Sequence, residues 1–133
     1  MSHDMKHHQQ LVEGAAESLG PILSRSKQAV YVYLDNAHKA CNSNFSKMLG
    51  YKTPREWAKL DVNFPEVFVD PKSRRALVSA YQKAMENQVG SSLEVTWKRK
   101  DGKTIPSSVI LVPYVHEGHL FALHFITKKT SSR

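Results

Sequence analysis

The first 25 residues carry apolar positions at helical spacing. Their apolar side chains recur every three or four residues, which places them on one face of a helix. The pair Gly20 and Pro21 interrupts the pattern, because proline disfavours helix at the preceding residue and can begin a short second turn. A helix with an apolar face must bury it, so residues 1–25 are expected either to cap the sheet of the same chain or to pair with a second copy. The apolar positions are Leu11, Val12, Ala15, Ala16, Leu19, Ile22 and Leu23.

A strand and its return follow this helix. Residues 29–34 read Ala-Val-Tyr-Val-Tyr-Leu, a β-branched and aromatic run that predicts a strand. Asp35 and Asn36 form a turn pair whose side chains can hydrogen-bond their own backbone. Residues 38–41 are expected to return as a second, short strand.

The middle of the chain has residues that typically begin and end helices, and their spacing predicts short helices followed by one long helix. Residues 42–49 predict a short helix ended by Gly50. A capping box that begins at Thr53 predicts the next helical turn. Residues 64–69 read as a short apolar link, and residues 71–87 as the longest helix of the domain. The apolar face of that long helix is Ala76, Leu77, Ala80, Tyr81, Ala84 and Met85.

The last third of the chain predicts three more strands. Residues 93–98 alternate between apolar and polar side chains, so one face is buried and the other is solvated. Asp101 and Gly102 are typical of a two-residue hairpin turn. Residues 105–114 and 120–127 read as the two strands that follow.

These elements predict one α+β domain over residues 26–129. The expected architecture is a five-stranded antiparallel sheet with short helices on one face, flanked by the N-terminal helix. Residues 130–133 are expected to be a disordered tail.

The order of the elements and several local motifs resemble the PAS domain family. The run Asn-Ser-Asn-Phe-Ser-Lys-Met-Leu-Gly-Tyr at residues 42–51 is similar to the family's Asn-x-x-Phe-x-x-x-Leu-Gly-Tyr. Val-Asp-Pro at residues 69–71 fits the entry to the long helix of the family. Glu94, followed by Lys-Arg-Lys-Asp-Gly-Lys at residues 98–103, is similar to a family hairpin. The resemblance covers residues 26–128 and implies a sensory or regulatory module of signal transduction.

One departure from the family lies at the end of the last strand. The family often has Asp-Ile-Thr there, and this chain has Phe-Ile-Thr at residues 125–127. The Asp-Ile-Thr motif hands the signal to an output domain. The chain is therefore expected to be either a stand-alone sensor or a piece of a larger one.

The resemblance also implies where a small ligand would bind. In PAS domains it lies between the inner face of the sheet and the short helices, with Asn42, Ser107 and His124 here as candidates for the rim. The same aromatic residues would form any core of this size, so a protein–protein interaction module with a filled core is the alternative. An error of one residue on a strand would move its side chains to the other face. The candidate lining residues are Tyr31, Tyr33, Phe45, Met48, Trp57, Phe64, Phe68, Tyr81, Met85, Trp97, Leu111 and Phe125.

The common cofactor motifs of the family are missing, so the cofactor is unknown. Haem-binding members often place an axial histidine on the long helix, and residues 71–87 contain none. Flavin-binding members place a reactive cysteine in an Asn-Cys-Arg context, whereas Cys41 stands in Ala-Cys-Asn-Ser. Cys41 is therefore expected to be a small buried apolar residue.

The chain is basic, with a formal net charge of +7 and a pI of about 9.6. A nucleic-acid-binding adaptor that uses residues 72–75 and 98–103 is the distant alternative function. No interleaved aromatic residues of the kind that stack on bases accompany these clusters, so nucleic-acid binding is not favoured.

No constellation of catalytic residues stands out. Ser107 and Ser108 could be paired with His124 on a neighbouring strand, but this pairing is no better than chance, and the chain is not expected to be an enzyme. His3 and His7 are four residues apart, a spacing that suits two metal ligands on a helix. They lie at the chain end, where a solvated tail is expected, so no metal site is predicted.

A cytoplasmic location is expected. The chain has a single cysteine, no apolar run of a signal peptide and no apolar stretch near the roughly 20 residues that span a bilayer. The expected partners are a second copy of the chain, bound through the N-terminal helix, and a small-molecule ligand.

Overall fold

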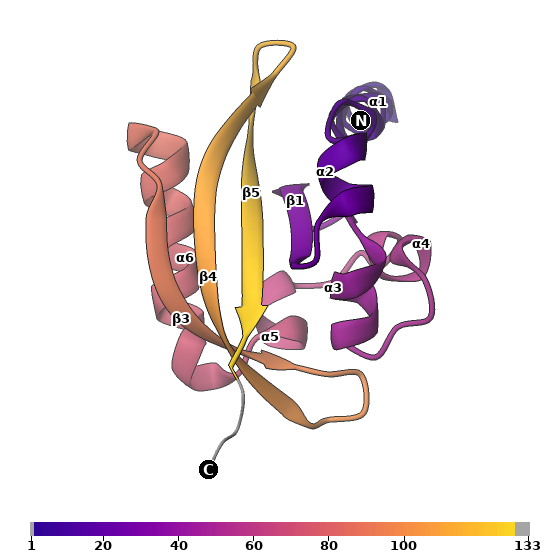
Figure 1. Cartoon of the computed structure of the whole chain (residues 1–133). Coiled ribbons are helices and arrows are strands. Elements are labelled where there is room, and N and C mark those ends of the chain that lie inside the picture. Colours follow the sequence, from indigo (N-terminus) through magenta and orange to yellow (C-terminus); the bar gives the residue numbers. More distant parts are fainter. Residues whose placement is uncertain (1, 130–133) are drawn as a thin grey trace.

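The computed structural model describes residues 2–129, with side chains from residue 7 onward. Its centre is a five-stranded antiparallel sheet, as expected, and the strands lie in the order β2-β1-β5-β4-β3 (Figure 1). The strands are β1 Ala29–Asp35, β2 His38–Cys41, β3 Ser91–Lys98, β4 Thr104–His116 and β5 His119–Lys128. The disordered tail expected at residues 130–133 lies outside the described residues.

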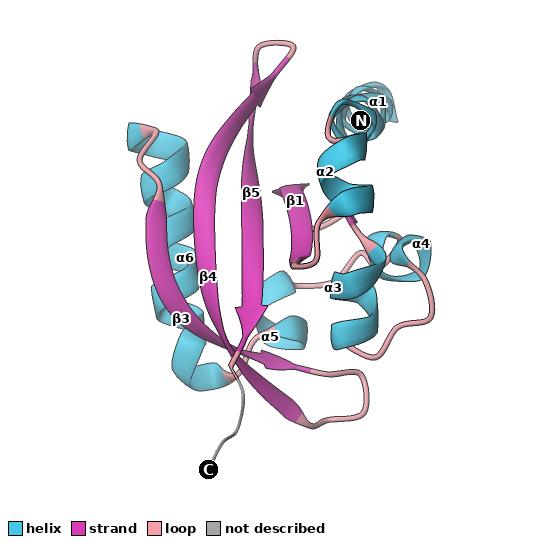
Figure 2. Ribbon diagram, in the orientation of Figure 1, coloured by secondary structure: helices cyan, strands magenta, loops and turns pink. Residues whose placement is uncertain are grey.

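Helices lie on both sides of the sheet (Figure 2). The inner face is covered by α3 Ser43–Met48, α4 Pro54–Ala58, α5 Phe64–Phe68 and α6 Pro71–Asn87. The outer face carries α1 Ser2–Ser18 and α2 Gly20–Arg25, which meet at the break predicted from Gly20 and Pro21. Within residues 2–129, no helix combines the length and apolarity that crossing a membrane requires.

The segment expected to be an apolar link at residues 64–69 is instead the helix α5. Its N-terminus is capped by Asn63, whose side-chain oxygen accepts a hydrogen bond from the Glu66 backbone N–H at 3.1 Å. Pro65 stands in the first turn, where its missing N–H costs no helical hydrogen bond. Asn63 and Pro65 are a helix-start signal that is present in the sequence. This signal favours a helix more strongly than the apolar side chains favour an extended link.

The turn between β3 and β4 is also longer than expected. The strands end at Lys98 and resume at Thr104, and the Arg99 N–H donates to the Lys103 carbonyl at 2.8 Å. Gly102 has a φ of +89°, which suits the left-handed position of a three-residue turn. The Asp101-Gly102 pair therefore marked the hairpin correctly but not its length.

Helix α1 buries its apolar face against the outer face of the chain's own sheet. We call this contact the outer cluster, and its buried members are Leu11, Val12, Ala15, Leu19, Val30, Val32, Phe121 and Leu123. Ile22 was expected on the same stripe but is 42% exposed, because the break before α2 ends the regular helical spacing. Of the two expected modes of burial, the structure has the intramolecular one.

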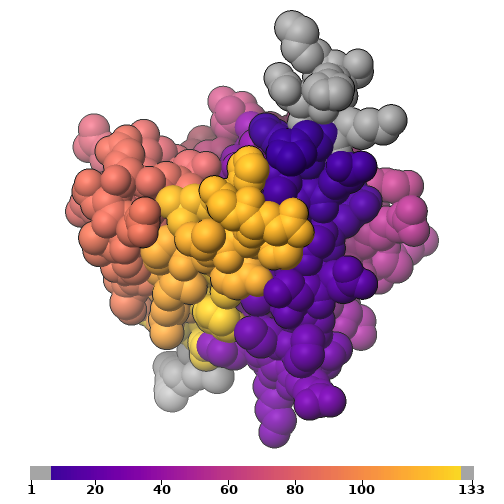
Figure 3. All heavy atoms as spheres, turned by 90° about the horizontal axis from the view of Figure 1, so that it is seen from above, coloured from indigo at the N-terminus to yellow at the C-terminus, as the bar shows by residue number. Residues whose placement is uncertain are grey.

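The N-terminal helix also reaches the tip of the β4–β5 hairpin. Seen from above, the atoms of α1 lie against those of the hairpin (Figure 3). The Tyr114 hydroxyl is 3.0 Å from the Ser18 hydroxyl, and a Cβ on Gly14 would lie 2.8 Å from His116 Nε2. A side chain at position 14 would therefore displace the His116 ring.

Asn42 joins three segments and gives the first testable prediction. Its side-chain oxygen accepts hydrogen bonds from the Val30 N–H at 3.1 Å and the Phe45 N–H at 3.0 Å, and its amide donates to the Gln28 carbonyl. Asn42 is 5% exposed, so replacement by alanine leaves the buried N–H groups of Val30 and Phe45 without their acceptor, while the Gln28 carbonyl keeps a hydrogen bond from the Asn44 amide at 3.3 Å. We expect Asn42→Ala to lower the free energy of unfolding by about 2 kcal/mol in urea titrations.

The control for this substitution is Asn63→Ala. Asn63 also caps a short helix, but its single hydrogen bond is exposed to solvent. We expect it to cost about 1 kcal/mol or less. Equal losses at both positions would contradict a bridging role for Asn42 beyond the cap.

Candidate ligand-binding site

The space between the sheet and the short helices is filled mainly by aromatic rings. Six of them, from five different elements, are at most 5% exposed. Their ring centroids are separated by 4.7 to 6.2 Å in the contacting pairs, most of which are tilted or edge-to-face as aromatic rings prefer. The rings are Tyr31, Phe45, Trp57, Phe64, Phe68 and Trp97.

Most of the residues expected to line a pocket belong to this inner core. Met48 and Leu111 are buried in it, while Tyr33, Tyr81 and Met85 are partly buried against it. Phe125 is an error of the prediction, because it packs against the outer cluster beneath α1. On β5 the inward side chains are Ala122, His124 and Ile126. The prediction was therefore wrong by one residue, which places Phe125 on the opposite face.

A small cavity of about 70 Å³ remains at the end of this core that faces α6. Its volume is about that of two water molecules in the liquid. It is far below the 300–1,000 Å³ typical of pockets for drug-sized ligands. The lining is almost entirely apolar and aromatic and consists of Tyr31, Tyr33, Phe64, Pro65, Leu77, Val78, Tyr81 and His124.

His124 is the polar side chain of interest in this cavity. It is 2% exposed, and its ring is stacked on that of Tyr31 with 4.0 Å between centroids. Burial lowers the pKa of His124 to about 3, and polar backbone groups of Ala122 and Tyr31 oppose this shift only in part. The imidazole is therefore neutral at pH 7, and its Nδ1 has no hydrogen-bond partner within the described residues.

The tyrosines around the cavity are held in their neutral form. Burial raises the pKa of Tyr31, Tyr33 and Tyr81 above the usual range. The Tyr33 hydroxyl donates to the Asn36 side-chain oxygen at 2.8 Å, so its donor is already used. At neutral pH the cavity can therefore offer hydrogen bonds but no charge.

The two other polar residues expected at the rim have structural roles instead. Ser107 is 1% exposed; its hydroxyl accepts from Trp97 Nε1 and donates to the Val95 carbonyl, both at 2.8 Å. Asn42 is occupied in the network described above. The register pairs His124 with Leu111 and Ser107 with Lys128, four positions further along, so Ser107 and His124 do not form a catalytic pair.

A buried lysine above the inner core was not foreseen from the sequence. Lys39 is 3% exposed, and its ammonium donates to the carbonyls of Asn36 and Leu60 and lies 5.0 Å from the centre of the Trp57 ring. Burial lowers the pKa of Lys39 to about 8, and the nearby carboxylates of Asp61 and Asp35 oppose the shift. Lys39 thereby connects β2 to the segment between α4 and α5.

Cys41, as expected, is buried, and burial raises the pKa of its thiol to about 12.

Four cations of the basic clusters, Arg74, Lys98, Arg99 and Lys100, are committed to contacts within the chain. Arg74 donates to three backbone carbonyls, and Lys98 donates to the Glu66 carbonyl. Arg99 donates to the Met48 carbonyl and pairs with Asp101, while Lys100 pairs with Glu56. Cations held in this way are poorly placed to contact phosphates.

A second hollow, of about 600 Å³, lies outside the inner aromatic core. Its lining includes the basic residues Lys27, Lys47 and Arg99 and the end of β5. Met48 is the expected lining residue that it contains. It lies at the surface and mixes apolar with basic side chains, whereas the resemblance implied an interior site.

Comparisons with known proteins agree on the architecture. No family model matches the sequence, and no curated protein is similar to it in sequence. Among solved structures, a PAS domain of an HTR-like protein from Haloarcula marismortui is 20% identical, covers 93% of this chain and 99% of its own, and has a TM-score of 0.61.

Two further structures match more closely in shape. The PAS domain of a Colwellia psychrerythraea protein is 19% identical, with 89% of this chain and 99% of that chain covered and a TM-score of 0.68. A LOV protein of Rhodobacter sphaeroides is 16% identical, with 90% and 69% covered and a TM-score of 0.68. The sheet order, the short helices on its inner face and these similarities together establish that the chain has the PAS fold.

Proposed function

We propose that this chain is a sensory or regulatory module that takes a small molecule into its inner cavity and transmits the occupancy to helix α1. The observation that carries the proposal is the alternation along β5. His124 faces the cavity, and its two neighbours, Leu123 and Phe125, face the outer cluster under α1. A ligand that moves His124 would therefore also move Leu123 and Phe125, which contact the side of the sheet where α1 packs.

The chemistry of the cavity restricts the proposed ligand. A volume of about 70 Å³ admits only a few non-hydrogen atoms without rearrangement. The lining favours an apolar body, and the unpartnered Nδ1 of His124 favours a single hydrogen-bonding group. The proposed ligand class is thus a small, uncharged molecule with one polar end.

Binding of small probes tests this proposal. We expect 1-propanol to shift the NMR signals of cavity residues with a dissociation constant of about 1 mM, given the energy that so few atoms can contribute. His124→Phe should weaken these shifts, because it keeps the aromatic shape but removes the polar atom. Native mass spectrometry of the freshly purified chain would detect a natural ligand directly.

A second substitution separates cavity binding from surface binding. Leu77 is 5% exposed and lines the cavity, so Leu77→Phe should fill it and remove all probe shifts. Val89→Phe places the same ring at a position that is 49% exposed and should leave them unchanged. Shifts that survive Leu77→Phe, or that never appear in the parent chain, would refute the ligand proposal.

The second candidate function is an interaction module with a filled core. The specific observation in its favour is the closed aromatic packing, which leaves so small a cavity. The surface available to a second copy includes Ile22 on α2 and Ile110 on β4, which are 42% and 50% exposed. Homodimerisation through this side, with the chain in a reducing, cytoplasmic setting, is part of either proposal.

A further inference from the structure

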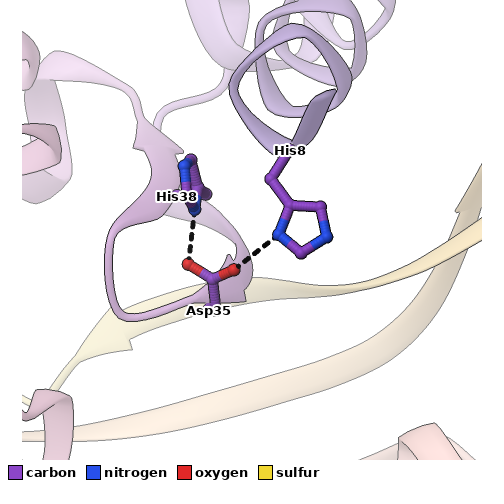
Figure 4. Close-up of side chains that lie close together, drawn as sticks. All are labelled: His8, Asp35 and His38. Carbon is purple, nitrogen blue, oxygen red and sulfur yellow. Dashed lines mark hydrogen bonds and ion pairs between the residues drawn. The ribbon is translucent and has the colours of Figure 1, made fainter. Parts of the chain in front are cut away.

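Three potential metal ligands meet where α1 crosses the β1–β2 hairpin. His8 comes from α1, Asp35 from the end of β1 and His38 from the start of β2 (Figure 4). His8 Nδ1 lies 3.1 Å from one carboxylate oxygen of Asp35, and His38 Nδ1 lies 2.7 Å from the other. One ligand atom from each of the three residues lies within 4.8 Å of the others.

One side of the cluster is buried and held in place, and the other side is exposed to solvent. His38 is 6% exposed, and the Asp35 oxygen that contacts it also accepts the Ala37 N–H at 3.0 Å, which holds the carboxylate in place. The side chains of His8 and Asp35 are 39% and 40% exposed, so an ion can reach them from solvent. An ionised carboxylate only accepts, so in the absence of an ion each Nδ1 donates to Asp35.

The spacing suits a small divalent ion. In tetrahedral zinc sites with bonds of about 2.0–2.1 Å, neighbouring ligand atoms are about 3.3 Å apart. The two N–O distances, 2.7 and 3.1 Å, lie close to that value, and the ligand atoms of the two histidines lie within 4.8 Å of each other, so side-chain rotation can bring all three around one ion. Binding requires the imidazole protons to move from Nδ1 to Nε2, a change of neutral tautomer that solvent can mediate.

We propose that His8, Asp35 and His38 bind a divalent transition-metal ion, with Zn²⁺ as the best-suited ion. Two imidazoles and one carboxylate are zinc ligands, and the exposed side leaves a fourth position for water or a further ligand. His8 and Asp35 are 27 residues apart in sequence and belong to different elements. A bound ion would therefore fasten α1 to the hairpin, independently of what occupies the inner cavity.

Calorimetric titration of the full chain, without an affinity tag, with Zn²⁺ tests the site. We expect one ion per chain and a rise in melting temperature of about 8–10 °C at a free zinc concentration 100 times the dissociation constant. His8→Ala and Asp35→Asn should each weaken binding by about 100-fold or more, since each removes or weakens a direct ligand. His8 is half-exposed, so its variant should remain folded, as its metal-free melting temperature will show.

The matched controls are other histidines near the same end of the molecule. The rings of His7 and His119 are 5.3 Å apart, and His7→Ala and His119→Ala should leave zinc affinity within about twofold of the parent. Co²⁺ in place of Zn²⁺ should give the strong visible absorption of a tetrahedral site. Absence of binding, or binding lost in His3→Ala or His7→Ala but kept in His8→Ala, would overturn the proposal.

Discussion

Replacing Val12 by aspartate is expected to detach helix α1 from the sheet. Val12 is 2% exposed and packs among the apolar side chains of the outer cluster. An unpaired charge at such a position costs roughly 4 kcal/mol, near the upper end for single substitutions. Undocking α1 relieves that cost, and we expect hydrogen exchange to show lost protection in α1 while β3 and β4 keep theirs.

The same variant decides what α1 does for association. Detachment uncovers the apolar side chains of Val30, Val32 and Phe121, so light scattering should show increased self-association. Gln10→Asp adds the same charge at an exposed position of the same helix and should behave as the parent chain. If Val12→Asp instead dissociated a parental dimer, the apolar face of α1 would be the contact between copies, and its intramolecular packing would not persist in solution.

Much of the fold could be predicted from the sequence because the residues that begin and end its helices and turns are neighbours in the chain. The long helix begins and ends where the sequence indicated, since Asp70 and Pro71 fix its start and Gln88 its left-handed end. The five antiparallel strands were expected from patterns such as the alternation along β3, where Val95 and Trp97 are buried, whereas the order of the strands in the sheet was not predicted. Two errors arose where one residue changes the result, Phe125 on β5 and the length of the turn at Asp101, and a third where the helix α5 was expected to be an apolar link.

The candidate sites were harder to predict, since they depend on contacts between distant segments. His124 is 2% exposed and is stacked on Tyr31, which lies on another strand. Nothing in the local sequence distinguishes it from a histidine on a solvated strand face. The cluster of His8, Asp35 and His38 exists only because α1 docks on the hairpin. The sequence drew attention to the regular spacing of His3 and His7, whereas the ligands that come together have no such spacing.

Acid is expected to destabilise the folded chain through His124. The unfolded chain takes up a proton with the ordinary histidine pKa of about 6.5, whereas burial holds the pKa of His124 in the folded chain at about 3. Between these values the unfolded state binds more protons, so stability is fully present above pH 6.5 and falls as the pH drops toward 3. We expect this residue alone to remove about 3 kcal/mol between pH 7 and pH 4.

A double comparison isolates this effect from the titration of other groups. The free energy of unfolding is measured in urea at pH 7 and pH 4 for the parent and for His124→Phe, which can still stack on Tyr31. The loss should be about 3 kcal/mol smaller in the variant, whereas His119→Phe at the hairpin tip should reproduce the parent. Because burial raises the pKa of Tyr31, its hydroxyl stays neutral throughout this range and does not contribute. An equal loss in parent and His124→Phe would mean that water or a partner reaches the imidazole, and that its Nδ1 is not the unpartnered atom on which the ligand proposal depends.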